Sequence, residues 1–250
     1  MHQHRRALSI HGLDFHWREY GTGPTVVLVH GLGVSGRYLL PTAKLLAADV
    51  RALVPDLPGF GRSSGPPRPL GLGGQAAALA EWLDAIDVPH ASFLGNSMGC
   101  QTLTRLAVEQ PGRVDRLVLV GPTIDPAHRN AASQLARLVV TAAFERPFLT
   151  PLVLYEYASQ PLRTVATAAH ALADAVEERL PRVAAPTLVV RGEHDALVPQ
   201  RWAEEVARLL RNGRLAVVAG TGHAVNYSAP DQLARLTLSF LSERSEPASD

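Results

Sequence analysis

The chain has 250 residues, 46% of them hydrophobic and 19% charged, and its formal net charge is +1 at neutral pH. The length suits one α/β domain with a sizeable core, and the composition is that of a soluble globular protein. The near-zero charge excludes a strong field for gathering nucleic acid or an anionic membrane. The basic residues are nearly all arginine and are scattered along the chain.

Cys100 is the only cysteine, so the chain cannot form an internal disulfide. The basic start at Met1–Arg6 is not followed by the apolar run of a secretory signal. No stretch reaches the roughly 18 uninterrupted apolar residues of a membrane helix. We therefore expect a cytoplasmic protein that binds neither nucleic acid nor membrane, with a polar tail, Ser242–Asp250, that frays.

The predicted elements begin with an antiparallel edge hairpin, because Leu8–Ile10 and Asp14–Tyr20 are short and half polar. Apolar runs predict strands at Thr25–Val29, Ala52–Val54, Ala91–Leu94, Arg116–Val120, Thr187–Val190 and Leu215–Val218. Helix-like segments lie between or after them at Gln75–Ile86, Met98–Glu109, Trp202–Leu210 and Gln232–Leu241. This alternation predicts a mostly parallel sheet with helices on both faces.

The region 123–182 breaks the alternation, because its apolar residues recur at helical spacing and no strand is evident. Three prolines divide it: Pro147, Pro151 and Pro161. We expect a small helical cap inserted at 123–182 into a core formed by 1–122 and 183–250.

A candidate nucleophile lies in Gly95-Asn96-Ser97-Met98-Gly99, between a predicted strand and a predicted helix. A strand that passes into a helix over so few residues needs a sharp turn at Ser97, with small neighbours such as Gly95 and Gly99. The turn would lift the Ser97 hydroxyl off the sheet and place the Met98 amide at a helix N-terminus, which favours negative charge. An ordinary Gly-Ser turn is the alternative.

A second glycine loop, His30-Gly31-Leu32-Gly33, follows the strand at Thr25–Val29. Glycines allow the backbone to approach a ligand closely. The Leu32 amide would join the Met98 amide in binding an oxyanion. His30 is an alternative catalytic base, although a histidine at a strand end more often braces a loop.

The candidate base is His223, which follows the last predicted strand in Gly220-Thr221-Gly222-His223. The candidate acid is Asp195, which would hold the His223 ring and stabilise its charged form. Glu193 and His194 are rival candidates, and a turn aspartate or a surface histidine is the ordinary alternative. The order Ser97, Asp195, His223 is that of an α/β hydrolase, and each residue follows a predicted strand, so parallel strands would bring all three to one edge.

On these motifs the chain resembles the α/β-hydrolase superfamily from roughly Phe15 to Leu241. Asp56–Ser63 is similar to the family's loop after its fourth strand, and Pro186–Val190 to the strand before its acid. The resemblance implies a mostly parallel eight-stranded sheet, a helical cap, and an oxyanion hole formed by the Leu32 and Met98 amides.

Residue identities separate the branches of this superfamily. Ser97 excludes the haloalkane dehalogenases and epoxide hydrolases, which use aspartate as nucleophile. The Gly-Asn-Ser-Met-Gly elbow is similar to that of hydrolases that cleave the C–C bond of meta-cleavage products, but Cys100 and the short glycine loop depart from their pattern. Those enzymes hold the substrate carboxylate with an arginine of the cap, for which the chain offers Arg129, Arg137, Arg146 and Arg163.

We therefore expect a carboxylesterase-like serine hydrolase that cleaves small to medium apolar esters without cofactor or metal. The alternatives are a C–C bond hydrolase, a perhydrolase or lyase, and a ligand-binding protein that does not turn over. The expected partner is a small ester-like molecule, and the protein is expected to be a monomer or homodimer. Apolar residues that would line the cap, or pack it on the core, are Leu149, Leu152, Leu154, Tyr155 and Tyr157.

Overall fold

The computed structural model describes residues 4–243 of the chain. Most of the tail predicted to fray, and the first three residues, lie outside this range. None of the helices within it is long and apolar enough to cross a membrane.

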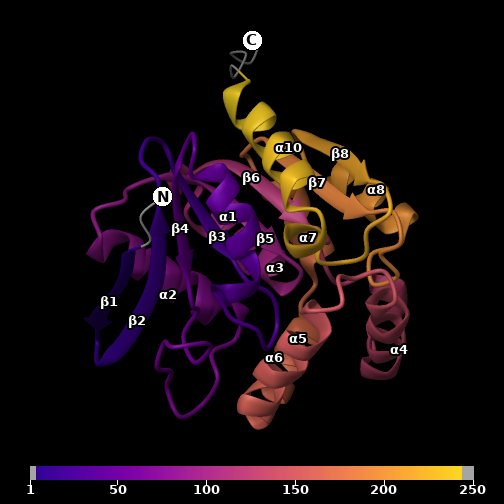
Figure 1. The fold of residues 1–250 in the computed structure, drawn as a ribbon, viewed down its shortest axis with the longest axis horizontal. Coiled ribbons are helices and arrows are strands. Elements are labelled where there is room, and N and C mark those ends of the chain that lie inside the picture. Colours follow the sequence, from indigo (N-terminus) through magenta and orange to yellow (C-terminus); the bar gives the residue numbers. More distant parts are fainter. Residues whose placement is uncertain (1–3, 244–250) are drawn as a thin grey trace.

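One eight-stranded sheet organises the fold, with strand order β1-β2-β4-β3-β5-β6-β7-β8 (Figure 1). Its strands are β1 (His4–Ile10), β2 (Leu13–Tyr20), β3 (Thr25–Val29), β4 (Arg51–Pro55), β5 (Ala91–Asn96), β6 (Val114–Val120), β7 (Thr187–Gly192) and β8 (Gly213–Val218). β1 and β2 run antiparallel as the predicted edge hairpin, and β2 also pairs antiparallel with β4. All other pairs are parallel, so the predicted fold class is confirmed.

The main helices are α1 (Leu40–Leu46), α2 (Leu72–Ala85), α3 (Met98–Glu109), α8 (Gln200–Leu209) and α10 (Pro230–Ser242). Short helical turns are η1 (Gly36–Leu39), η2 (Pro111–Arg113) and α9 (Val225–Ser228). The sequence analysis found α2, α3, α8 and α10, with ends displaced by up to three residues. It missed α1, which has only seven residues and carries a proline in its first turn, where proline is tolerated.

Between β6 and β7 the chain forms a helical insert without strands, as the spacing of its apolar residues predicts. Its elements are η3 (Pro126–His128), α4 (Ala131–Ala142), α5 (Leu149–Ser159), α6 (Pro161–Ala173), α7 (Val176–Arg179) and η4 (Leu180–Arg182). Helices α5 and α6 lie side by side, and α4 stands apart from them (Figure 1).

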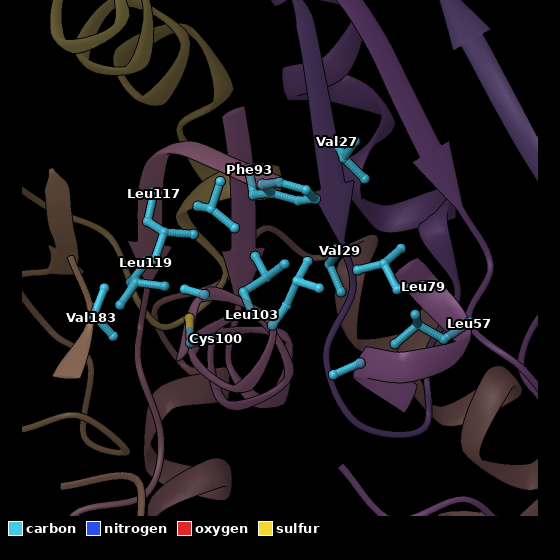
Figure 2. Close-up of a cluster of buried hydrophobic side chains, with 14 of the residues drawn as sticks. Val27, Val29, Leu57, Leu79, Phe93, Cys100, Leu103, Leu117, Leu119 and Val183 are labelled. Carbon is cyan, nitrogen blue, oxygen red and sulfur yellow. The ribbon is translucent and has the colours of Figure 1, made fainter. Parts of the chain in front are cut away.

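Alternate side chains along the strands pack into two hydrophobic layers, one on each face of the sheet. Val27 and Val29 of β3 pack with α2, α3 and α8, whereas Val26 and Leu28 pack with α1 and α10. Figure 2 shows part of the first layer, in which side chains of β3 and β5 lie beside side chains of helices α2 and α3. Burial on both faces explains why these strands read as continuous apolar runs rather than alternating ones.

Replacing Leu79 by alanine in this first layer should lower the free energy of unfolding by about 2–5 kcal/mol, because the side chain is fully buried and leaves a cavity. Urea denaturation at unchanged m-value measures the loss. Leu162→Ala is the matched control: that side chain is 86% exposed, so stability should stay within about 0.5 kcal/mol. Equal losses in both variants would contradict the assigned core.

Candidate active site

Ser97 lies in a sharp turn where β5 passes into α3. β5 ends at Asn96, α3 begins at Met98, and Ser97 between them has φ +57°, a left-handed conformation that is uncommon outside glycine. A Cβ atom at Gly99 would lie 2.5 Å from the carbonyl oxygen of Val29. The turn is therefore held by direct backbone packing of α3 against the end of β3.

The loop after β3 lies directly beside this turn. A Cβ atom at Gly31 would be 3.1 Å from Ser97 Cβ. The Tyr38 hydroxyl accepts a hydrogen bond from the Gly31 amide at 2.8 Å and donates one to Asn96 Oδ1 at 2.6 Å. Tyr38 thus joins the glycine loop to the residue before Ser97.

His30 is fully buried, and both of its ring nitrogens have backbone partners. Nε2 accepts from the Leu57 amide at 2.9 Å, and Nδ1 lies 2.9 Å from the Gly31 carbonyl oxygen. Burial lowers the pKa of His30, so the ring is neutral. These contacts brace the loops after β3 and β4 and leave neither nitrogen free to act as a base.

The Leu32 side chain packs against the small cluster that contains Met98. Neither backbone amide donates a hydrogen bond to any residue within 4–243. The two amides therefore stay the candidate donors of an oxyanion hole.

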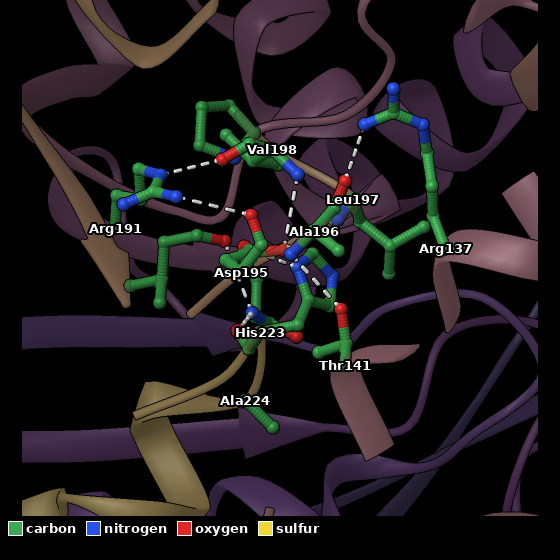
Figure 3. Close-up of polar contacts among 12 residues, drawn as sticks. Arg137, Thr141, Arg191, Asp195, Ala196, Leu197, Val198, His223 and Ala224 are labelled. Carbon is green, nitrogen blue, oxygen red and sulfur yellow. Dashed lines mark hydrogen bonds and ion pairs between the residues drawn. The ribbon is translucent and has the colours of Figure 1, made fainter. Parts of the chain in front are cut away.

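His223 and Asp195 form a buried pair, with His223 Nδ1 2.8 Å from Asp195 Oδ2 (Figure 3). The second carboxylate oxygen, Oδ1, accepts the amides of Leu197 and Val198 at 2.9 and 3.0 Å, and Arg191 donates to the Asp195 carbonyl. Asp195 is thus a turn aspartate that also binds the histidine.

Opposing effects act on the pKa of His223. Burial lowers it, but the charge of Asp195, its hydrogen bond and the charge of Glu145 together outweigh burial, so the pKa is raised above the ordinary value. The protonated ring therefore stabilises the fold. That contribution is full below the unfolded-state pKa and is lost as pH rises through the folded-state pKa.

The other ring nitrogen, His223 Nε2, is buried and has no hydrogen-bond partner in the described part of the chain. The Ser97 hydroxyl makes no hydrogen bond to it here, and such bonds often form only with substrate present. Asn96 connects the two regions, since its Nδ2 donates to the His223 carbonyl at 3.2 Å. His223 Nε2 therefore remains open to a hydrogen-bond donor.

The two rival candidates, Glu193 and His194, have other partners. Glu193 is exposed and accepts the Gly220 amide at 2.9 Å, and the exposed His194 stacks on Phe144.

Cys100, beneath the Ser97 turn, donates to the Gly95 carbonyl, and burial raises the pKa of its thiol. Such a thiol is inert, in agreement with a core role.

Gly121 is a site residue that the sequence analysis missed. It follows β6 with φ +56°, and a Cβ atom there would lie 2.8 Å from the His223 ring and 3.2 Å from Asp195 Oδ2. The signal was available, because Gly121 comes directly after a predicted strand, as the other site residues do.

The helical insert contacts the loop of the base through Glu145, a second residue that was missed. Glu145 Oε1 accepts the Ala224 amide at 2.8 Å, and Oε2 accepts the Ser228 hydroxyl at 2.5 Å. Arg137 and Thr141 of α4 bind the carbonyl and amide of Ala196, next to the acid (Figure 3).

The insert also contacts the glycine loop. Glu156, only 8% exposed, accepts the Ser35 amide at 2.6 Å and its hydroxyl at 2.7 Å. A Cβ atom at Gly33 would lie 2.7 Å from Tyr157 and from Thr164. The insert is therefore attached to both loops that flank Ser97.

The apolar residues expected to line the cap, or to pack it on the core, differ in their exposure. Leu149 is buried in the core, whereas Leu154 and Tyr155 are exposed. Among the candidate arginines, Arg129 pairs with Glu177, and Arg163 binds the Pro66 carbonyl. No group of three or more metal-ligating side chains occurs within residues 4–243.

Comparison with known proteins agrees with this geometry. Residues 26–236 match the Alpha/beta hydrolase family, and the chain belongs to that family. It is 28% identical over 253 residues to the putative carbamate hydrolase RutD of Pseudomonas syringae pv. syringae (strain B728a), covering 92% of this chain and 98% of that protein. The putative non-heme chloroperoxidase of Synechocystis sp. (strain ATCC 27184 / PCC 6803 / Kazusa) is 27% identical, with 92% and 95% covered.

Among solved structures, a thermophilic esterase from Thermogutta terrifontis superposes with a TM-score of 0.80 at 22% identity, covering 95% of this chain and 98% of that one. A serine hydrolase involved in carbazole degradation superposes with a TM-score of 0.81 at 24% identity, covering 97% and 100%. At these identities the likeness shows the fold. The chain is thus a hydrolase of the α/β-hydrolase superfamily.

Glu145→Gln should lower the pKa of His223, because it removes a negative charge that favours the imidazolium while keeping an oxygen acceptor for Ala224. Titration of the His223 ring by NMR measures the change. Glu81→Gln removes the same charge from an exposed position without a partner and should leave the pKa unchanged. A His223 pKa that is identical in all three proteins would refute the coupling.

Gly121→Ala should displace the His223 ring and weaken its bond to Asp195, because the added Cβ meets the ring at 2.8 Å. Gly220→Ala is the matched control: its φ is +68°, so backbone strain is similar, but no atom lies within 4 Å of the added Cβ. Both variants should lose at least about 1 kcal/mol of stability to backbone strain, and Gly121→Ala should lose more because of its contact with the ring. Only the first should lower the pKa of His223, and a shared shift would attribute the effect to strain.

Proposed function

We propose that the chain is a serine hydrolase that cleaves carboxylic esters through an acyl-Ser97 intermediate. The observation that carries this proposal is the buried, unpartnered Nε2 of His223, whose opposite nitrogen is fixed by Asp195 at 2.8 Å. The strained turn at Ser97 lies at the same edge of the sheet. A nucleophile, a base and a group that orients the base are the parts that acyl transfer needs.

In the first half-reaction, His223 Nε2 takes the hydroxyl proton as Ser97 Oγ attacks the carbonyl carbon. The negative charge that develops on the carbonyl oxygen is bound by the Leu32 and Met98 amides. Such a donor contributes about 3 kcal/mol to transition-state stabilisation. The C–O bond to the alcohol then breaks, and the imidazolium returns its proton to the leaving oxygen.

In the second half-reaction, His223 takes a proton from water, whose oxygen attacks the acyl-serine carbonyl. The bond to Ser97 Oγ breaks, the imidazolium protonates the serine, and the carboxylic acid leaves. Because only neutral His223 acts as base, kcat/KM should rise with pH through a pKa above the ordinary value of about 6.5.

We propose further that the insert acts as a cap that selects the substrate. Thr164 and Thr167 of α6 are buried, and neither hydroxyl has a hydrogen-bond partner among residues 4–243. Thr164 contacts the Gly33 position, beside the proposed oxyanion hole. The unsatisfied Thr164 hydroxyl at this place favours a substrate that carries a polar group next to its carbonyl.

A carbamate is the second candidate substrate, because several relatives are named putative carbamate hydrolases. A carbamate offers the same carbonyl to Ser97, and its nitrogen would supply the polar group that the Thr164 hydroxyl lacks as a partner. The chemistry differs only in the group that remains on the serine.

The experiment is multiple-turnover hydrolysis of p-nitrophenyl esters from acetyl to decanoyl, and of a p-nitrophenyl carbamate, by wild type and Ser97→Ala. We expect the variant to lose at least about a thousand-fold in kcat, since it removes the nucleophile. Cys100→Ser, beneath the same turn, should retain activity. Absence of turnover by folded wild type on every ester and carbamate would reject the proposal and leave C–C substrates and pure binding to be tested.

A further inference from the structure

A groove of about 460 Å³, lined by neither Ser97 nor His223, lies between the β1–β2 hairpin, the loops after β3 and β4, and the end of α5. Four arginines from separate parts of the sequence line it: Arg5, Arg18, Arg37 and Arg62. The fold therefore gathers four arginines that are scattered in the sequence.

Arg5 and Arg18 are direct cross-strand partners in the β1–β2 ladder. Side chains at such positions share one face of the hairpin, with Cβ atoms about 5 Å apart, and like charges there are destabilising. The Arg5 side chain has no carboxylate partner in the described part of the chain. An anion held between the two guanidinium groups would turn this repulsion into attraction.

Arg18 is only 7% exposed, yet most of its donors are unused. Its one hydrogen bond joins Nη1 to Asp56 Oδ1 at 3.2 Å. Asp56 is shared with the backbone, since Oδ1 also accepts the Gly36 amide and Oδ2 accepts the Arg62 amide. Arg18 lines the groove, and its Nε and Nη2 make no hydrogen bond within residues 4–243, so these donors can bind a ligand.

The remaining charges leave the groove positive. The Arg62 side chain has no partner within residues 4–243. Arg37 approaches Glu156 only to 3.8 Å, and both Glu156 oxygens already accept hydrogen bonds from Ser35. Four guanidinium groups thus face two carboxylates that are mainly engaged by backbone and hydroxyl donors.

We propose that this groove binds an anionic molecule through a phosphate or carboxylate group that is clamped by Arg5, Arg18 and Arg62. The planar guanidinium fork matches both oxyanions in two-point contacts. The volume exceeds that of one phosphate, so the group belongs to a larger anionic molecule. Binding needs neither Ser97 nor His223, so it is independent of the proposed hydrolysis.

The test is calorimetric titration with pyrophosphate and, separately, with citrate, at ionic strength held constant with potassium chloride. Wild type is compared with the double variant Arg5→Gln/Arg62→Gln. The matched control is Arg68→Gln/Arg235→Gln, which removes two exposed, unpaired arginines outside the groove and leaves the same net charge. Circular dichroism checks that all three proteins are folded.

We expect the Kd of at least one probe to rise about ten-fold or more in the groove variant, equivalent to about 1.4 kcal/mol, and to change less than about two-fold in the control. Binding of pyrophosphate alone identifies a phosphate ligand, and binding of citrate alone a carboxylate ligand. Ser97→Ala should bind as wild type does. No binding of either probe up to about 10 mM, or equal weakening in both double variants, overturns the proposal.

Discussion

The contact between the end of β3 and the first turn of α3 is the constraint on which the site depends. At Gly99 the helix backbone approaches the Val29 carbonyl so closely that a methyl group cannot fit. This approach sets the Ser97 turn beside the loop that carries Leu32, and the side chains of Leu32 and Met98 then share one cluster. The position of Ser97 relative to the glycine loop is therefore a property of backbone packing, which is dense and yields little.

Contacts from the ends of the strands and from the helical insert hold the rest of the site. On the strand side, Gly121 leaves room for the His223 ring. Asp195 binds its own turn with one carboxylate oxygen and the imidazole with the other. On the other side, the insert binds the loop that carries His223 through Glu145, and the loop after β3 through Glu156. A movement of the insert would therefore disturb both loops together.

Sequence reasoning recovered six strands, because apolar runs bounded by glycine and proline mark buried parallel strands. It found the edge hairpin from two short, half-polar segments, and it found the longer core helices. It also selected Ser97, Asp195 and His223, which the structure brings to one edge. It did not find Glu145, because a carboxylate that binds backbone amides across 79 residues leaves no local pattern. For the same reason it did not see Arg5 and Arg18 converge, since that juxtaposition depends on the register of the hairpin.

Strand β1 lies at the border of the sheet, and within the described residues no further strand pairs with its outer side. An open border of this kind can recruit a strand from another molecule and start aggregation. Here nearly every β1 side chain is exposed, and Arg5 and Arg6 carry charge along it. Charged borders repel their own copies. Arg5 on this exposed strand therefore opposes the pairing of two copies edge to edge.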